Sequence, residues 1–167
     1  MRKALAVLFC MLIFTVLPAC SSASAKAADI VFAFTCSAQV TTQSGTVSCT
    51  VTRAAPQSAS ITVQSPEEIS GMTYTWGDNF IISYAGLVTK SSECSLPKSS
   101  FAAQLIGVLD AASMQDALTV SGNSAFTGIY DNAAFTLTVD SKSGYIQQIE
   151  IPRYGIKATL SNYKSVT

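Results

Sequence analysis

The chain has 167 residues, equal numbers of basic and acidic side chains, a hydrophobic content of 49% and no histidine. The missing histidine removes the usual general base of serine and cysteine nucleophile systems and argues against a zinc site. Charged residues form no basic stripe and no block of one sign, so nucleic acid is not expected as a partner. We therefore expect no catalytic site, no metal and no cofactor.

Residues 1–19 have the pattern of an export signal. A short basic start, Met1–Lys3, precedes an uncharged apolar run from Ala4 to Leu17. This run has the length of a signal-peptide core and is too short for a stable transmembrane helix. The chain is therefore expected to leave the cytoplasm.

The next residues, Leu17-Pro18-Ala19-Cys20, resemble the bacterial lipobox, in which the peptide is cut before the cysteine and the cysteine carries a lipid. The resemblance implies a membrane anchor on Cys20, followed by a flexible tether over residues 20–28. The protein would then be held outside the cytoplasm, at the cell surface or in a periplasm. The alternative is ordinary secretory cleavage after Ala25 or Ala27, which would release it.

Residues 29–167 have the size of one domain. Apolar and polar residues alternate with a period of two through its first part, which is the pattern of half-buried strands. Turns are predicted at Thr41–Ser44 and at Gly77–Asn79, where turn-forming residues interrupt the alternation. The predicted strands cover 32–40, 46–52, 61–63, 72–76, 80–84 and 86–89.

The centre of the chain has a helical pattern instead. Ser100 can cap a helix, and a single apolar stripe follows at helical spacing, formed by Phe101, Leu105, Val108, Leu109 and Ala112. The spacing predicts one amphipathic helix of about three turns. Gly107 lowers the helix propensity and indicates a close approach to the sheet.

Strands then resume at 118–120, 126–130, 135–139, 145–151 and 156–160, with a turn at Asp131-Asn132 and a loop at 140–144. Links of hairpin length predict antiparallel neighbours, and clean alternation predicts one buried sheet face. One helix can cover about nine or ten strands only if the sheet curls around it. The expected fold is therefore α+β, a curved antiparallel half-barrel with the mid-chain helix packed on its concave face.

Four pieces of this arrangement resemble a known superfamily: Ser65–Met72, the strand pair Tyr74–Tyr84 with Gly86-Leu87, the helix Ser100–Ala112, and Phe135–Asp140 with Gly144. The order looks like that of the LolA/LolB/LppX-type lipoprotein carriers. The resemblance implies a half-barrel closed by helices around an apolar cavity. This chain is shorter than the periplasmic carriers, has one clear helix and keeps its own lipid, so it is more similar to small surface lipoproteins of that fold.

The half-barrel suggests a site for a lipid or another hydrophobic small molecule, although for any single lining candidate a place in the packed core is the favoured interpretation. The alternative function is a non-enzymatic surface module that binds a protein or a cell-wall component through tyrosines such as Tyr145, Tyr154 and Tyr163. A monomer is expected in either case. The lining candidates are Phe32, Phe34, Trp76, Phe80, Leu105, Leu109, Phe126 and Phe135.

Three cysteines remain in the domain, and two lie on apolar strand faces. A four-residue turn at Thr41–Ser44 would place Cys36 opposite Cys49, where an exported protein can keep a disulfide. The alternative is that both are buried free thiols. The third, Cys94, has no assigned role.

Three short motifs occur in the order used by penicillin-recognising serine enzymes: Ser95-x-x-Lys98, Ser121-Gly122-Asn123 and Lys142-Ser143-Gly144. The resemblance is shallow, because those enzymes need a far longer chain. They also carry the third motif on a strand, whereas Lys142–Gly144 is predicted as a turn. This activity is not expected.

Overall fold

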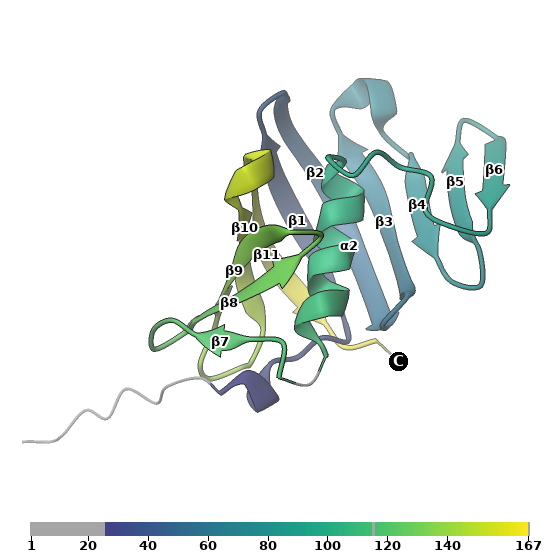
Figure 1. Ribbon diagram of the computed structural model, residues 1–167. Helices are drawn as coiled ribbons and strands as arrows, with labels where there is room; N and C mark the ends of the chain where they lie inside the picture. Colours follow the sequence, from purple (N-terminus) through teal and green to yellow (C-terminus); the bar gives the residue numbers. More distant parts are fainter. Residues whose placement is uncertain (1–25, 115, 167) are drawn as a thin grey trace, which may run out of the picture.

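A computed structural model describes residues 26–114 and 116–166. Within these residues, one open antiparallel sheet bends around a single α-helix, α2 (Phe101–Ala112), as Figure 1 shows. The predicted fold class is confirmed. The first group of elements comprises η2 (Ala27–Asp29), β1 (Phe34–Thr42), β2 (Gly45–Ala55), β3 (Ser58–Ser65), η3 (Glu67–Ile69), β4 (Thr73–Trp76), β5 (Phe80–Tyr84) and β6 (Leu87–Ser91).

The second group follows the helix and completes the sheet from its other edge. Its elements are β7 (Thr119–Val120), β8 (Ala125–Tyr130), β9 (Ala133–Val139), β10 (Ile146–Ile151), η4 (Pro152–Tyr154) and β11 (Ile156–Lys164). The sheet has the order β6-β5-β4-β3-β2-β1-β11-β10-β9-β8-β7, so the first and last strands pair in its middle. Helix α2 connects the two edge strands across the concave side.

The described sheet has eleven strands, where nine or ten were expected. Each of the eleven coincides with one of the predicted segments, including the two edge strands β6 and β7, which the sequence predicted at 86–89 and 118–120. The residues of these edge strands are nearly all exposed.

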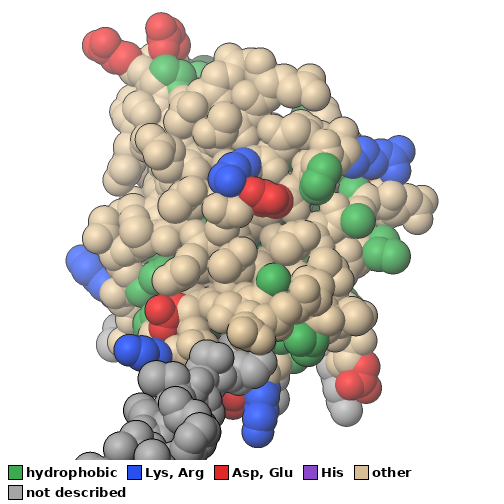
Figure 2. Space-filling model, turned by 90° about the vertical axis from the view of Figure 1, so that its left-hand side faces the viewer, with side chains coloured by type: hydrophobic (Ala, Val, Ile, Leu, Met, Phe, Trp, Pro, Cys, Tyr) green, Lys and Arg blue, Asp and Glu red, His purple; other side chains and the backbone are tan. Residues whose placement is uncertain are grey.

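The interior of the half-barrel is filled by side chains. Alternate residues of β1 are buried from Phe34 to Val40, which confirms the predicted face. Helix α2 buries Leu105, Val108 and Leu109 against the sheet, as its stripe predicts. Figure 2 shows one face of the molecule, on which charged and apolar side chains are scattered among uncharged polar side chains and backbone.

The predicted close approach at Gly107 is confirmed. A Cβ atom on Gly107 would lie only 2.1 Å from the ring of Tyr130 in β8. Tyr130 ends its strand at a two-residue hairpin in which Asp131 and Asn132 both have positive φ angles, 47° and 57°. This is the turn that the sequence predicts there.

The turn predicted at Thr41–Ser44 is two residues too long, and both extra residues belong to β1. Strand β1 continues to Thr42, which pairs with Gly45 across a two-residue link. The hydroxyl of Thr42 accepts a hydrogen bond from the N–H of Ser44, at 3.2 Å, and donates to the carbonyl of Gly45, at 3.0 Å. These side-chain bonds lie within the turn, and the pairing of the two strands is shifted by two residues from the predicted one.

Candidate functional site

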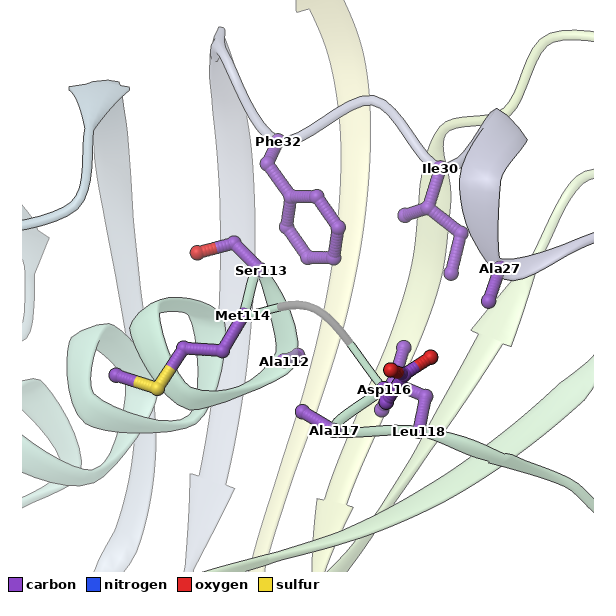
Figure 3. A pocket seen from close by; sticks show the side chains of 9 residues that line it. All are labelled: Ala27, Ile30, Phe32, Ala112, Ser113, Met114, Asp116, Ala117 and Leu118. Atoms are coloured by element: carbon purple, nitrogen blue, oxygen red, sulfur yellow. The ribbon is translucent and has the colours of Figure 1, made fainter.

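A cavity of about 360 Å³ lies between the first described residues and the C-terminal end of α2. Figure 3 shows Ile30 and Phe32 on one side and Ala117 and Leu118 facing them from the other. We call this the rim cavity, because it opens at one end of the half-barrel. Its lining residues are Ala27, Ile30, Phe32, Ala112, Ser113, Met114, Asp116, Ala117 and Leu118.

The segment between η2 and β1 forms one wall of the rim cavity. The N–H of Val31 donates to the carbonyl of Gly144 in the β9–β10 loop, at 2.9 Å. Gly144 has a φ of +74°, and a Cβ atom there would lie 2.2 Å from the carbonyl oxygen of Asp29. A glycine is therefore needed for the loop to hold this wall so closely.

Arg53 of β2 ties that wall to the helix. Its Nη1 donates to the carbonyl of Phe32 at 2.8 Å, and its Nη2 donates to Oγ of Ser113 at 2.8 Å. The same guanidinium pairs with the carboxylate of Asp110, with 2.9 Å between Nη2 and Oδ1. Arg53 is only 1% exposed. Its buried hydrogen bonds fix the distance between the two walls of the rim cavity.

The rim cavity has an apolar interior. The hydroxyl of Ser113 already donates to the carbonyl of Asp110, at 2.8 Å, and accepts from Arg53. The one charged side chain of the lining, Asp116, is exposed. A chamber with mostly apolar side chains and polar groups at its edge suits an apolar molecule with a polar end.

A second cavity, of about 320 Å³, lies near the other end of α2 and is more polar. Lys98 and Asp131 form an ion pair across it, with 2.7 Å between Nζ and Oδ1. Nε2 of Gln104 donates to the carbonyl of Lys98 at 2.6 Å, whereas its Oε1 has no hydrogen-bond partner among the described residues. The lining residues are Cys94, Leu96, Lys98, Ala103, Gln104, Tyr130 and Asp131.

The eight predicted lining residues are divided between core and cavity. Phe32 lines the rim cavity, and Trp76 and Phe80 line a third cavity of about 220 Å³ beside Cys94. The other five are buried in the packed core and line none of these three cavities: Phe34, Leu105, Leu109, Phe126 and Phe135.

Cys36 and Cys49 are buried free thiols in the structure. The register on which the disulfide prediction rested is wrong, since Cys36 faces Val51 and Cys49 faces Ala38. Burial raises the pKa of each thiol from 9.0 to about 12, and the neighbouring Cys49 adds to the shift at Cys36. Both side chains act here as small apolar core residues.

The tyrosines considered as surface contacts are half-buried rather than free. The rings of Tyr145 and Tyr163 stack, with centroids 4.3 Å apart, and the hydroxyl of Tyr163 donates to the carbonyl of Ile146. Tyr154 lies beside the guanidinium of Arg153, 5.9 Å from its ring centroid. These contacts hold the rings against the sheet.

The serine-enzyme motifs are not assembled into one site. Lys98 precedes the first turn of α2, whereas the loop containing Lys142 is bonded to the segment beside the last turn. A helix of twelve residues separates these places by about 18 Å. Across residues 26–114 and 116–166, no group of three metal-ligating side chains is suited to a metal ion.

Cys20, the predicted anchor, lies outside the described residues. The part of the chain that the structure describes contains no helix of the length and apolarity needed to cross a membrane. The first described element, η2, includes the last two residues of the predicted tether.

Sequence reasoning missed Arg53 and its partner on the helix. A signal was present, because Arg53 continues the buried alternation of Val47, Cys49 and Val51 along β2. A charged residue in phase with buried positions indicates a buried partner of opposite charge. The position of that partner, 57 residues away in Asp110, depends on the tertiary fold.

Comparison with models of protein families finds no match, and comparison with curated proteins finds none. Among solved structures, the chain is similar to a LolA superfamily protein from Nitrosomonas europaea, with a TM-score of 0.42 and 9% sequence identity. The match covers 80% of this chain and 85% of the other. The superfamily of that protein is the one named above as a resemblance of the sequence.

Proposed function

We propose that the chain is a lipid-anchored, extracytoplasmic binding protein that holds one apolar ligand in the rim cavity. The observation that carries the proposal is the apolar lining of that cavity, between Ile30 and Phe32 on one side and Leu118 on the other. The interior of the half-barrel is filled, so the rim is where a ligand can enter without unpacking the core.

The size of the rim cavity limits the class of ligand. Its volume of about 360 Å³ lies near the lower end of small-molecule sites, which span about 300–1,000 Å³. One acyl chain or a similar apolar molecule fits this space better than a lipid with several chains. The proposed ligand is therefore a fatty acid or a single-chain lipid, with its polar end in the solvent at the opening of the cavity.

Binding of a fluorescent fatty acid such as cis-parinaric acid tests the ligand. Ala117→Trp puts an indole into the rim cavity and should abolish binding, whereas Val88→Trp on the exposed strand β6 serves as the matched control. Equal binding by both variants would count against the rim cavity as the site.

The anchor has its own test. Cys20→Ala removes the sulfur that would carry the lipid and should release the protein from the membrane fraction. A variant that stays as firmly in that fraction as the wild type would disprove the anchor and leave the ligand proposal standing.

A second candidate function, a surface module for a protein partner, is supported by the edge strand β6. Leu87 and Val88 are 75% and 67% exposed there, beside the unpaired backbone groups of a sheet edge. Under this alternative, Leu87→Lys with Val88→Lys abolishes capture of a partner and leaves fatty-acid binding intact.

A further inference from the structure

One end of the domain carries exposed apolar side chains around the opening of the rim cavity. Met114, at the end of α2, is 66% exposed, and Val120, in β7, is 56% exposed. Met114 lines the rim cavity, and β7 begins directly after Leu118 of the same lining. We call this end the rim face; Figure 1 shows η2, β7 and the C-terminal residues gathered there.

The C-terminal residues also contribute to the rim face. Lys164 pairs with Thr35 at the start of β1, so the residues after β11 lie beside the segment that leads from η2. Val166, two residues further on, is another partly exposed apolar side chain. The rim face therefore combines three separate parts of the chain.

The length of the tether fixes which end of the domain faces the anchor. Six residue steps separate Cys20 from Lys26, where the described chain begins, and they reach at most about 22 Å. A domain of about 140 residues is about 37 Å across, so the tether is shorter than the domain. A lipid on Cys20 would therefore hold the η2 end closer to the membrane than the opposite end.

The charges of the rim face are balanced, so its contact with a membrane would be apolar. Lys26 and Lys164 are offset by the exposed carboxylates of Asp29 and Asp116. Polybasic segments add about 1 kcal/mol per basic residue on anionic membranes, but this face has no such excess. Neutral lipid should therefore be sufficient for contact.

We propose that the rim face lies on the outer surface of the bilayer, with Met114 and Val120 in the interfacial region and the rim cavity open towards the lipid. Apolar side chains at such interfaces are buried by about 5–10 Å. An acyl chain then passes from the membrane into the rim cavity without crossing water. This inference rests on the anchor of the proposed function.

Tryptophan fluorescence can locate the contact, because the chain has a single tryptophan. In a Trp76→Phe background, Met114→Trp and Val120→Trp place the reporter on the rim face, and Val88→Trp places it on the β6 edge. The full-length lipidated protein is reconstituted in phosphatidylcholine vesicles with and without lipids brominated near the headgroup, and flotation of the vesicles measures attachment.

We expect each rim-face reporter to lose a large part of its fluorescence to brominated lipid, because an interfacial side chain lies at the depth of the bromine atoms, and the β6 reporter to lose little. Equal quenching at all three positions in a protein that floats would overturn the inference and leave the anchor intact. If the protein does not float with the vesicles, the anchor is disproved and the inference fails with it. Fatty-acid binding by the rim cavity is tested separately.

Discussion

The guanidinium of Arg53 and the carboxylate of Asp110 form a buried ion pair between β2 and the last turns of α2, with Nε 3.0 Å and Nη2 2.9 Å from Oδ1. The other oxygen of Asp110 accepts a hydrogen bond from the N–H of Gln57, at 3.0 Å. The pair thus fixes the helix to the β2–β3 hairpin directly beside the rim cavity. Its hydrogen bonds to Phe32 and Ser113 connect the stability of the fold with the shape of the cavity.

Loss of either partner should be costly. Arg53→Met leaves the carboxylate of Asp110 without its cation, and breaking a buried pair in this way costs about 3–5 kcal/mol of unfolding free energy. Urea denaturation measures the change. Lys157→Met breaks the exposed pair with Glu150 and should cost less than about 1 kcal/mol. Similar losses in both variants would contradict the structural role given to Arg53.

Gly107 offers a test of packing against propensity. Gly107→Ala improves helix propensity by about 1 kcal/mol, but its methyl group would collide with the ring of Tyr130, and overpacking costs about 1–3 kcal/mol. We expect a net loss of stability. In a Tyr130→Ala background the same substitution should stabilise, so a double-mutant cycle from thermal melts should show coupling. Stabilisation in both backgrounds would mean that the ring moves freely.

The cysteines should divide into two classes. Cys94 is exposed, whereas Cys36 and Cys49 are buried and, with their pKa raised to about 12, stay protonated at neutral pH. Because the thiolate is the reactive form, a disulfide reagent should modify Cys94 in the folded protein and the other two only after unfolding. Thiol counting by mass spectrometry distinguishes them, and a Cys94→Ser variant is the control. Absence of the two buried thiols after non-reducing denaturation would instead show a disulfide.

The same thiols predict a loss of stability in alkali. The folded state holds both protons up to a pKa of about 12, whereas the unfolded chain releases them near 9.0. Their contribution is therefore complete below pH 9 and is lost as the pH rises from 9 through 12. Urea midpoints across this window should fall less steeply in Cys36→Ala/Cys49→Ala. An unchanged slope would assign the alkaline loss to other groups.

Local patterns in the sequence predicted most of the fold. The alternation along β1, the helix from Phe101 to Ala112 and the turn at Asp131-Asn132 each follow from neighbouring residues, and the structure confirms them. The hairpin register could not be predicted, because a shift of two residues leaves every side chain on the same face of the sheet, and alternation does not distinguish the two pairings.

The candidate site was less accessible to sequence reasoning. Phe32 and Phe34 are equivalent in pattern, yet Phe32 lines the rim cavity and Phe34 is in the core under the ring of Tyr163, 5.1 Å away. Core and cavity use the same residue types, and only the path of α2 across the sheet separates them. A cavity lined by all eight predicted residues would need an open space between the sheet and the helix. In the structure the helix packs against the sheet and fills that space.

Native mass spectrometry of the protein released gently from its membrane is the most direct test of the central claim, that the rim cavity holds one apolar ligand. We predict a non-covalent mass of the size of a fatty acid or single-chain lipid, lost on denaturation, absent from Ala117→Trp and retained by Val88→Trp. A wild-type protein carrying no non-covalent mass, or a ligand that persists in Ala117→Trp, would contradict the account.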